Sequence, residues 1–189
     1  MAKLFLMRHG ETYFNKWHRI QGWCDSALTP TGVKQAKEIK EYFLKNNIRF
    51  DRRYSSTSER ACATMEIICE NSPYLRLRSL KECNFGKFEG SSERVNPPYP
   101  YGDFFKQYGG ESEKEVQVRM NSTILPIMSS SDGEDNILIV SHAGAIINFL
   151  ISVNMNPQVV KDQGFGPCSV LEFDFNDQKL KLKQIINPS

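Results

Sequence analysis

The sequence has few cysteines, few histidines and no long apolar run, and each shortage excludes a class of protein. The five cysteines are odd in number and none are spaced as Cys-x-x-Cys, so neither a disulfide framework nor a zinc ribbon is indicated. We expect reduced, mostly buried thiols. No stretch approaches the roughly 20 apolar residues of a membrane span, and Arg8 and His9 interrupt the short apolar run that a signal peptide would need to extend. We therefore predict a cytoplasmic protein with no membrane partner.

The charge balance also argues against a polyanionic partner. The 24 Lys and Arg residues nearly cancel the 22 Asp and Glu residues, which leaves a net charge of +2. No global field then favours nucleic acid, and any attraction for an anion must be local. With 189 residues, of which 40% are hydrophobic, the chain suits one domain over residues 1–189.

Hydrophobic periodicity predicts strands alternating with helices and then a terminal hairpin. Strands are expected at 3–7, 49–55, 74–78, 136–141, 169–175 and 179–186, and helices at 30–46, 57–71, from 111 onward and at 144–153. Pro126 is expected to kink or end the third helix, and Asn176-Asp177 to mark the hairpin turn. This order indicates a three-layer α/β/α fold with a mainly parallel central sheet and an antiparallel edge. The order of the strands in the sheet does not follow from it.

Residues 84–110 have a different character. They are rich in glycine, proline and aromatic side chains and have no clear period, which predicts a long excursion containing a short helix. Packing is the simplest role of its aromatic residues, which are Tyr99, Tyr101, Phe104, Phe105 and Tyr108. We also hypothesise that this segment is a lid that sets ligand preference, with Phe104 and Phe105 favouring hydrophobic or ring-bearing ligands.

Four residues whose side chains can transfer a proton or bind an anion lie where predicted strands end. His9 and His142 each follow a strand, Arg60 opens the helix after the second strand, and Glu82 follows the strand near Tyr74–Arg78. In an open α/β sheet this rim is where ligands bind, and helix N-termini there favour anions. Either histidine on its own would be interpreted as a structural residue. Two histidines in such positions, with arginines and glycines nearby, indicate a phosphate site instead.

Five ordered blocks carry a family resemblance through most of the chain. They are RHGET at 8–12 with RIQGWCDSALTPTG at 19–32, SSTSERACAT at 55–64, LKECNFGKFEG at 80–90, GGES at 109–112 and ILIVSHAGAI at 137–146. Together they resemble the histidine phosphatase superfamily, the phosphoglycerate mutase-like proteins.

The resemblance implies a site and a mechanism. His9 would attack phosphorus and form a phosphohistidine, with its other ring nitrogen donating to a backbone carbonyl near Gly10. Glu82 would be the general acid and then the general base, although Glu89 and Glu93 lie close to it in the sequence. The phosphate would be held by Arg8, Asn15, Gln21, Gly22, Arg60, His142 and the backbone at Ala143.

Competing chemistries lack their motifs. No cysteine begins a Cys-x-x-x-x-x-Arg loop, no Asp-x-Asp follows the first strand, and there is no Walker loop. A metal held by His9 and His142 would lie among arginines, so we expect no metal and no cofactor.

Within the family, we expect a phosphatase acting on a small phosphate ester. Two motifs look like the phosphatase branch. The first is the acid block Glu82-Cys83-Asn84-Phe85-Gly86, where the mutases have a block that resembles Glu-Arg-x-Tyr-Gly. The second is the pair Gln21-Gly22, where the mutases tend to have Ser-Gly. A bisphosphoglycerate-dependent mutase is the alternative, and a phosphate-binding protein without turnover is a second one. The oligomeric state does not follow from the sequence.

Overall fold

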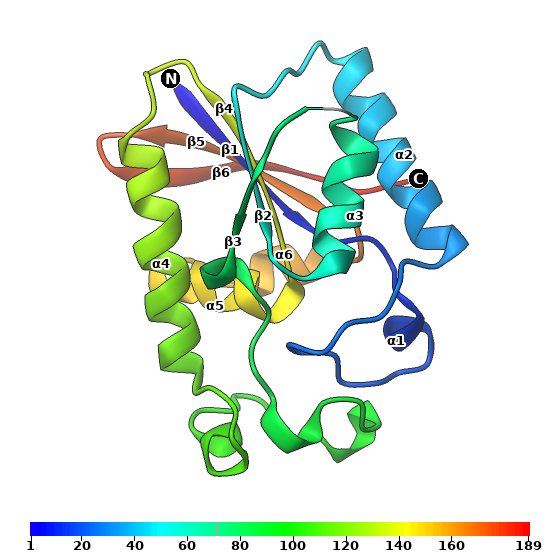
Figure 1. Cartoon of the computed structure of the whole chain (residues 1–189). Coiled ribbons are helices and arrows are strands. Elements are labelled where there is room, and N and C mark those ends of the chain that lie inside the picture. Colours follow the sequence, from blue (N-terminus) through cyan, green and yellow to red (C-terminus); the bar gives the residue numbers. More distant parts are fainter. Residues whose placement is uncertain (71) are drawn as a thin grey trace.

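The computed structural model describes residues 1–70 and 72–189, and over these residues a six-stranded sheet forms the centre of the molecule (Figure 1). The strands are β1 (Ala2–Arg8), β2 (Arg52–Ser56), β3 (Leu75–Leu77), β4 (Asn136–Ser141), β5 (Val170–Asn176) and β6 (Lys179–Ile186). Their order is β3-β2-β4-β1-β5-β6. The first four are mutually parallel, and β5 and β6 add an antiparallel edge. The predicted fold class is confirmed.

Helices cover both faces of the sheet. They are α1 (Tyr13–Lys16), α2 (Pro30–Lys45), α3 (Glu59–Ile68), α4 (Glu113–Ser129), α5 (Ala143–Ser152) and α6 (Gln158–Asp162). Alternate residues of β1 point to opposite faces. Leu4 and Leu6 belong to a core with α4 and α5, whereas Phe5 and Met7 belong to a second core with α2 and α3. Two apolar cores thus fix the three layers.

Most predicted elements are present, and α1 and α6 are present in addition to them. Helix α4 continues past Pro126 to Ser129, so of the two expected effects of this proline, a kink or an end, the end is excluded. The hairpin turn is centred one residue later than expected, because Asp177 and Gln178 have the positive φ angles. The helix expected to reach residue 71 ends at Ile68, and residue 71 itself lies outside the described residues.

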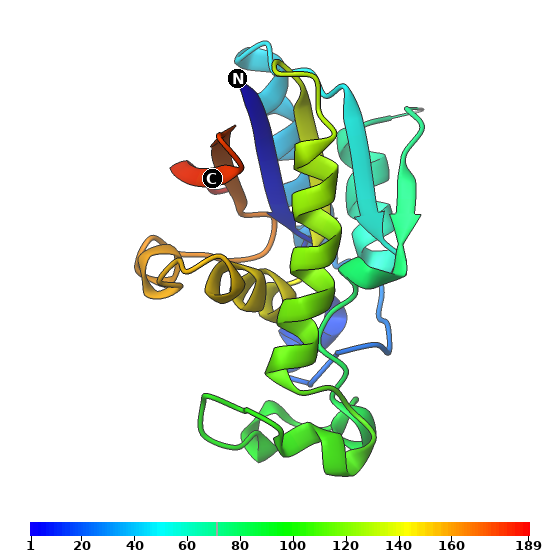
Figure 2. The ribbon, with the colours of Figure 1, turned by 90° about the vertical axis from the view of Figure 1, so that its left-hand side faces the viewer.

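The strand ends and the excursion lie at one end of the molecule. β1 and β4 run in register to Arg8 and Ser141, and β2 ends beside them at Ser56. Both views place residues 84–110, drawn in green, beyond the ends of these strands (Figures 1 and 2). The excursion contains three short 3₁₀ helices, Gly86–Phe88, Glu93–Val95 and Phe104–Tyr108, where one was expected. Over the described residues, no helix combines the length and the apolar character that crossing a membrane requires.

An aromatic cluster packs the excursion. Phe105 is 2% exposed and makes edge-to-face contacts with Phe85, Phe88, Tyr101 and Phe104, with ring centroids 4.9 to 5.5 Å apart. Such pairs add to the free energy gained by burying the rings. These aromatic residues therefore have a packing role, as predicted, but the contacts are chiefly among rings of the excursion itself.

Phe105→Ala should destabilise the protein by about 3 kcal/mol, because it opens a cavity in the centre of this cluster. Urea unfolding followed by circular dichroism measures the change. Tyr99→Ala, at a position 48% exposed, is the matched control and should cost much less. Equal losses for the two variants would show that the cluster does not stabilise the fold.

Candidate active site

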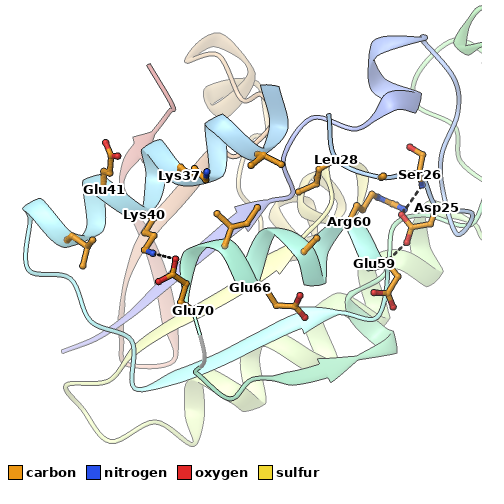
Figure 3. A pocket seen from close by; sticks show the side chains of 15 residues that line it. Asp25, Ser26, Leu28, Lys37, Lys40, Glu41, Glu59, Arg60, Glu66 and Glu70 are labelled. Atoms are coloured by element: carbon orange, nitrogen blue, oxygen red, sulfur yellow. Dashed lines mark hydrogen bonds and ion pairs between the residues drawn. The ribbon is translucent and has the colours of Figure 1, made fainter. Parts of the chain in front are cut away.

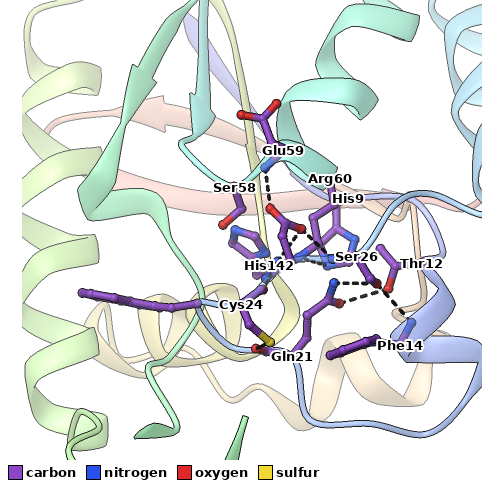
Figure 4. A network of polar contacts seen from close by, with 12 residues as sticks. His9, Thr12, Phe14, Gln21, Cys24, Ser26, Ser58, Glu59, Arg60 and His142 are labelled. Carbon is purple, nitrogen blue, oxygen red and sulfur yellow. Dashed lines mark hydrogen bonds and ion pairs between the residues drawn. The ribbon is translucent and has the colours of Figure 1, made fainter. Parts of the chain in front are cut away.

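His9 lies immediately after β1 and is fixed by its backbone. Its N–H donates to the carbonyl of Ser141 at 3.0 Å, and its carbonyl accepts from the N–H of Cys168 at 3.1 Å. The ring Nδ1 donates to the carbonyl of Gly10 at 2.7 Å, and Nε2 accepts from Nε of Arg60 at 3.3 Å (Figure 4). The proton is therefore on Nδ1, and the lone pair of Nε2 faces the arginine. The expected bond near Gly10 is confirmed.

The imidazole of His9 is neutral in this environment. Burial lowers its pKa well below the ordinary value of 6.5, and the positive charges of Arg60 and Arg8 lower the pKa further. The carbonyl of Gly10 favours the charged form but is a smaller influence. A neutral imidazole with an unprotonated Nε2 is the nucleophilic form of histidine.

Arg60 lies in the first turn of α3 and is 1% exposed. Its guanidinium donates to the carbonyls of Gly22 and Cys24 at 2.8 and 2.9 Å, and to Oδ1 of Asp25 at 2.9 Å. Asp25 compensates the charge and also accepts the N–H of Glu59 at the start of the helix. Arg60 is therefore a buried residue of the site and not a surface residue of the helix.

Glu89 fixes the loop at residues 22–24, whose carbonyls accept hydrogen bonds from Arg60. Its carboxylate accepts the N–H groups of Trp23 and Cys24, both at 2.7 Å, and that of Phe85 at 3.2 Å. Gly22 has φ +59°, and a Cβ there would collide with this carboxylate, so the loop requires glycine. Glu89 is thus committed to the backbone, which argues against it as the alternative acid.

Two buried donor-bearing atoms near His9 have no partner among the described residues, namely Nε of Arg8 and Nδ1 of His142. The ring of His142 lies 5.2 Å from that of His9, and its Nε2 is 2.8 Å from the hydroxyl of Ser56. Burial, and then the charge of Arg60, lowers the pKa of His142 well below 6.5. Burial also lowers the pKa of Arg8, and the nearby Glu82 opposes that effect. Unpartnered buried polar groups of this kind indicate a place for an anion.

Glu82 is 8% exposed and is held at the N-terminus of α5. Its carboxylate accepts the N–H groups of Cys83, Gly144 and Ala145 at 2.8, 3.0 and 2.7 Å. Its backbone carbonyl accepts from Arg119 at 2.8 Å. These contacts fix the carboxyl group at the start of the helix that follows His142.

A cavity of about 240 Å³ joins these groups. Of the predicted residues, its lining includes Arg8, His9, Asn15, Gln21, Gly22, Arg60, Glu82 and Ala143, while His142 lies buried beside His9. The side-chain oxygen of Asn15 accepts a hydrogen bond from the N–H of Thr12, and that of Gln21 accepts one from the hydroxyl of Thr12. These bonds fix both amide groups.

The excursion contributes different residues from those expected. Phe104 and Phe105 do not line the cavity, because they pack within the aromatic cluster; Phe85, Glu93, Asn96 and Tyr101 do. Arg19 joins them from the N-terminal segment. The sequence signal for Arg19 was its place in the block at 19–32, and no periodicity marks the other four.

A larger hollow of about 1060 Å³ lies between α2 and α3 (Figure 3). It shares Asp25 and Arg60 with the site, and its rim carries the ion pair of Lys40 and Glu70 at 2.6 Å. Its lining includes no histidine, whereas His9 lines the smaller cavity, which makes the smaller cavity the candidate active site.

The sequence model of the histidine phosphatase superfamily, branch 1, matches residues 4–188. The chain belongs to this superfamily. It is 28% identical to a 2,3-bisphosphoglycerate-dependent phosphoglycerate mutase of Buchnera aphidicola over 95% of this chain and 96% of the relative. It is 30% identical to a broad-specificity phosphatase of Saccharomyces cerevisiae over 77% of this chain and 67% of the relative.

Solved structures agree with this histidine phosphatase assignment. A mutant phosphoserine phosphatase from Entamoeba histolytica, in complex with phosphoserine, superimposes with a TM-score of 0.82 at 28% identity, covering 98% of this chain and 96% of that one. The family resemblance and the fold are therefore confirmed, and membership supports a phosphoryl-transfer enzyme, either a phosphatase or a mutase.

The buried neutral histidines make stability depend on pH. Unfolded histidine binds a proton near pH 6.5, whereas folded His9 and His142 do so only at much lower pH. Their contribution is therefore present above pH 6.5 and is lost as the pH falls. Urea unfolding should show a loss of about 1 kcal/mol per histidine between pH 7.5 and 5.5. His142→Asn should reduce this loss and His18→Gln, on the surface, should not; an unchanged pH dependence in His142→Asn would contradict the account.

Glu89→Gln should weaken the binding of inorganic phosphate by roughly tenfold. An amide has one oxygen for three N–H groups, and a backbone donor left unpaired costs about 1–3 kcal/mol, so the loop that fixes Arg60 should loosen. Isothermal calorimetry measures the change. Glu70→Gln, the same substitution on the exposed surface, is the control, and equal affinities in the two variants would show that Glu89 does not position the loop.

Proposed function

We propose that this protein is a phosphatase that hydrolyses small phosphate esters through a phosphohistidine on His9. The observation that supports it best is the state of that ring. His9 is neutral, its Nδ1 proton is bound to Gly10, and its Nε2 lone pair lies beside the guanidinium of Arg60. An unprotonated nitrogen among cations suits attack on an anionic phosphate.

In the first step, Nε2 of His9 attacks phosphorus as the bond to the leaving oxygen breaks. Arg60 then donates to a phosphate oxygen in place of Nε2, and Arg8 supplies further charge-assisted hydrogen bonds. Glu82 gives its proton to the leaving alcohol. The products are the free alcohol and a phosphorylated His9.

In the second step, Glu82 takes a proton from water as the water oxygen attacks phosphorus. The nitrogen–phosphorus bond breaks, and its electron pair returns to Nε2. The hydroxyl of Ser56 can donate to Nε2 of His142, which leaves a proton on Nδ1 for a phosphate oxygen. Asn15, Gln21, Gly22 and the backbone at Ala143 complete the proposed phosphate site.

The cavity favours a phosphatase over a mutase. A mutase must bind the carboxylate and the second phosphate of bisphosphoglycerate with additional cations. The excursion instead contributes Glu93, Asn96 and two aromatic rings, and its basic residues Lys87, Arg94 and Lys106 are absent from the cavity lining. Beyond Arg8 and Arg60, that lining holds among the described residues a single further cation, Arg19. The mutase stays the second candidate, because the Buchnera relative matches nearly the whole chain.

Three further expectations belong to this proposal. Residues 1–189 act as one domain, with 84–110 as the segment that sets specificity. Catalysis needs no metal, because the arginines supply the positive charge that the phosphate requires. The five free thiols suit the reducing cytoplasm.

The phosphoserine phosphatase from Entamoeba histolytica has been solved with phosphoserine and with 3-phosphoglyceric acid, which supports small esters as ligands.

His9→Ala should abolish hydrolysis, with a loss of at least about 10³-fold in kcat, because no other group replaces the nucleophile. A panel of sugar phosphates, nucleoside monophosphates and phosphoglycerates, assayed with EDTA present, measures turnover. Acid-labile phosphate should form on the unaltered protein and be missing from His9→Ala. His18→Ala is the matched control and should retain activity.

Two results would contradict the proposal. Interconversion of 2- and 3-phosphoglycerate that outpaces hydrolysis would establish the mutase. Tight phosphate binding with no turnover of any ester would establish a binding protein.

A further inference from the structure

Two charged residues at the mouth of the cavity, one positive and one negative, have no role in the proposed mechanism. Arg19 and Glu93 both line it, beyond the arginines and histidines that surround the proposed phosphate position. They come from segments more than 70 residues apart in the sequence. Both residues are therefore available to contact the part of the ligand that lies outside the phosphate site.

Backbone hydrogen bonds hold the two residues on one rim. Arg19 and Ser92 form an antiparallel bridge. The N–H of Glu93 donates to the carbonyl of His18 at 2.8 Å, and Ile20 N–H donates to the carbonyl of Ser91 at 2.9 Å. The guanidinium of Arg19 donates to the carbonyl of Gly90 at 2.6 Å, which fixes the side chain against the same ribbon. The two charges are thus held by the fold.

Neither charge is fully used within the protein. Over the described residues, Arg19 forms no ion pair and Glu93 pairs with His18 alone, at 3.5 Å. The side chains of that pair are 83% and 47% exposed, so it is weak. Burial lowers the pKa of Arg8 and raises the pKa of Tyr101, and the charge of Glu93 raises both pKa values as a smaller influence. A guanidinium suits a ligand carboxylate, and a carboxylate suits a ligand ammonium group.

We propose that Arg19 and Glu93 select phosphate esters whose alcohol portion carries both a carboxylate and an ammonium group, as in a phosphorylated hydroxyamino acid. Arg19 binds the carboxylate and Glu93 the ammonium group. The proposal rests on the proposed phosphatase function and adds to it the two residues that determine specificity. An ester with a second anion and no cation satisfies Arg19 alone, and its added negative charge is repelled by Glu93.

Four esters of similar size separate the two contacts. Phosphoserine carries both groups, phosphoethanolamine only the ammonium group, phosphoglycolate only the carboxylate, and ethyl phosphate neither. The unaltered protein should have its highest kcat/KM for phosphoserine. Glu93→Gln should lower kcat/KM about fivefold for the two ammonium esters, a modest change because the side chain is half-exposed. Arg19→Gln should do the same for the two carboxylate esters. Arg94→Gln, one residue from Glu93 and outside the cavity lining, should change none.

Calorimetry on His9→Ala tests the same selection without turnover, with the same order of affinities expected. The selection is wrong if phosphoserine is turned over and bound no better than ethyl phosphate, or if each variant changes all four esters equally. Hydrolysis of all four esters without discrimination would leave the phosphatase function intact. Ordered binding without hydrolysis of any ester would overturn the phosphatase function and leave the selection standing.

Discussion

The site depends on one uncharged ring among positive charges. His9 can serve as the proposed nucleophile because Gly10 accepts its Nδ1 proton and because Arg60 and Arg8 disfavour a second proton. The same guanidinium groups that keep the ring neutral are placed to bind the phosphate that it would attack. One arrangement of charge therefore serves both the nucleophile and its target, and it requires burial, since solvent would screen the arginines.

The rest of the structure holds this arrangement in place from several directions. Asp25 and two backbone carbonyls fix Arg60, and Glu89 fixes the loop that supplies them. Glu89 also binds Phe85, so the loop around Arg60 is joined to the segment that lines the cavity mouth. Residues outside the reacting centre can therefore influence both phosphate binding and the choice of ester, because they share these hydrogen bonds.

Much of the fold and the centre of the site could be predicted from the sequence, for a physical reason. Strands with strong apolar patterns end at one rim, so His9, Arg60 and His142 were placed together without knowing the strand order. The roles of Asp25, Ser56 and Glu89 could not be predicted, because each depends on a partner distant in the sequence. The excursion has no period, and Phe104 and Phe105, which were hypothesised to favour hydrophobic ligands, are absent from the cavity lining because these rings pack the segment itself.

The protonation state of His9 is the most direct test of this account. Nitrogen-15 NMR of imidazole-labelled protein, free of phosphate, reports separately on Nδ1 and Nε2, and His9→Ala assigns the signals. The account predicts a proton on Nδ1 and a bare Nε2 at neutral pH, unchanged as the pH falls through the ordinary histidine value of 6.5, because burial and the arginines lower the pKa of the ring. A ring protonated on both nitrogens at neutral pH, or a single proton on Nε2, would contradict it.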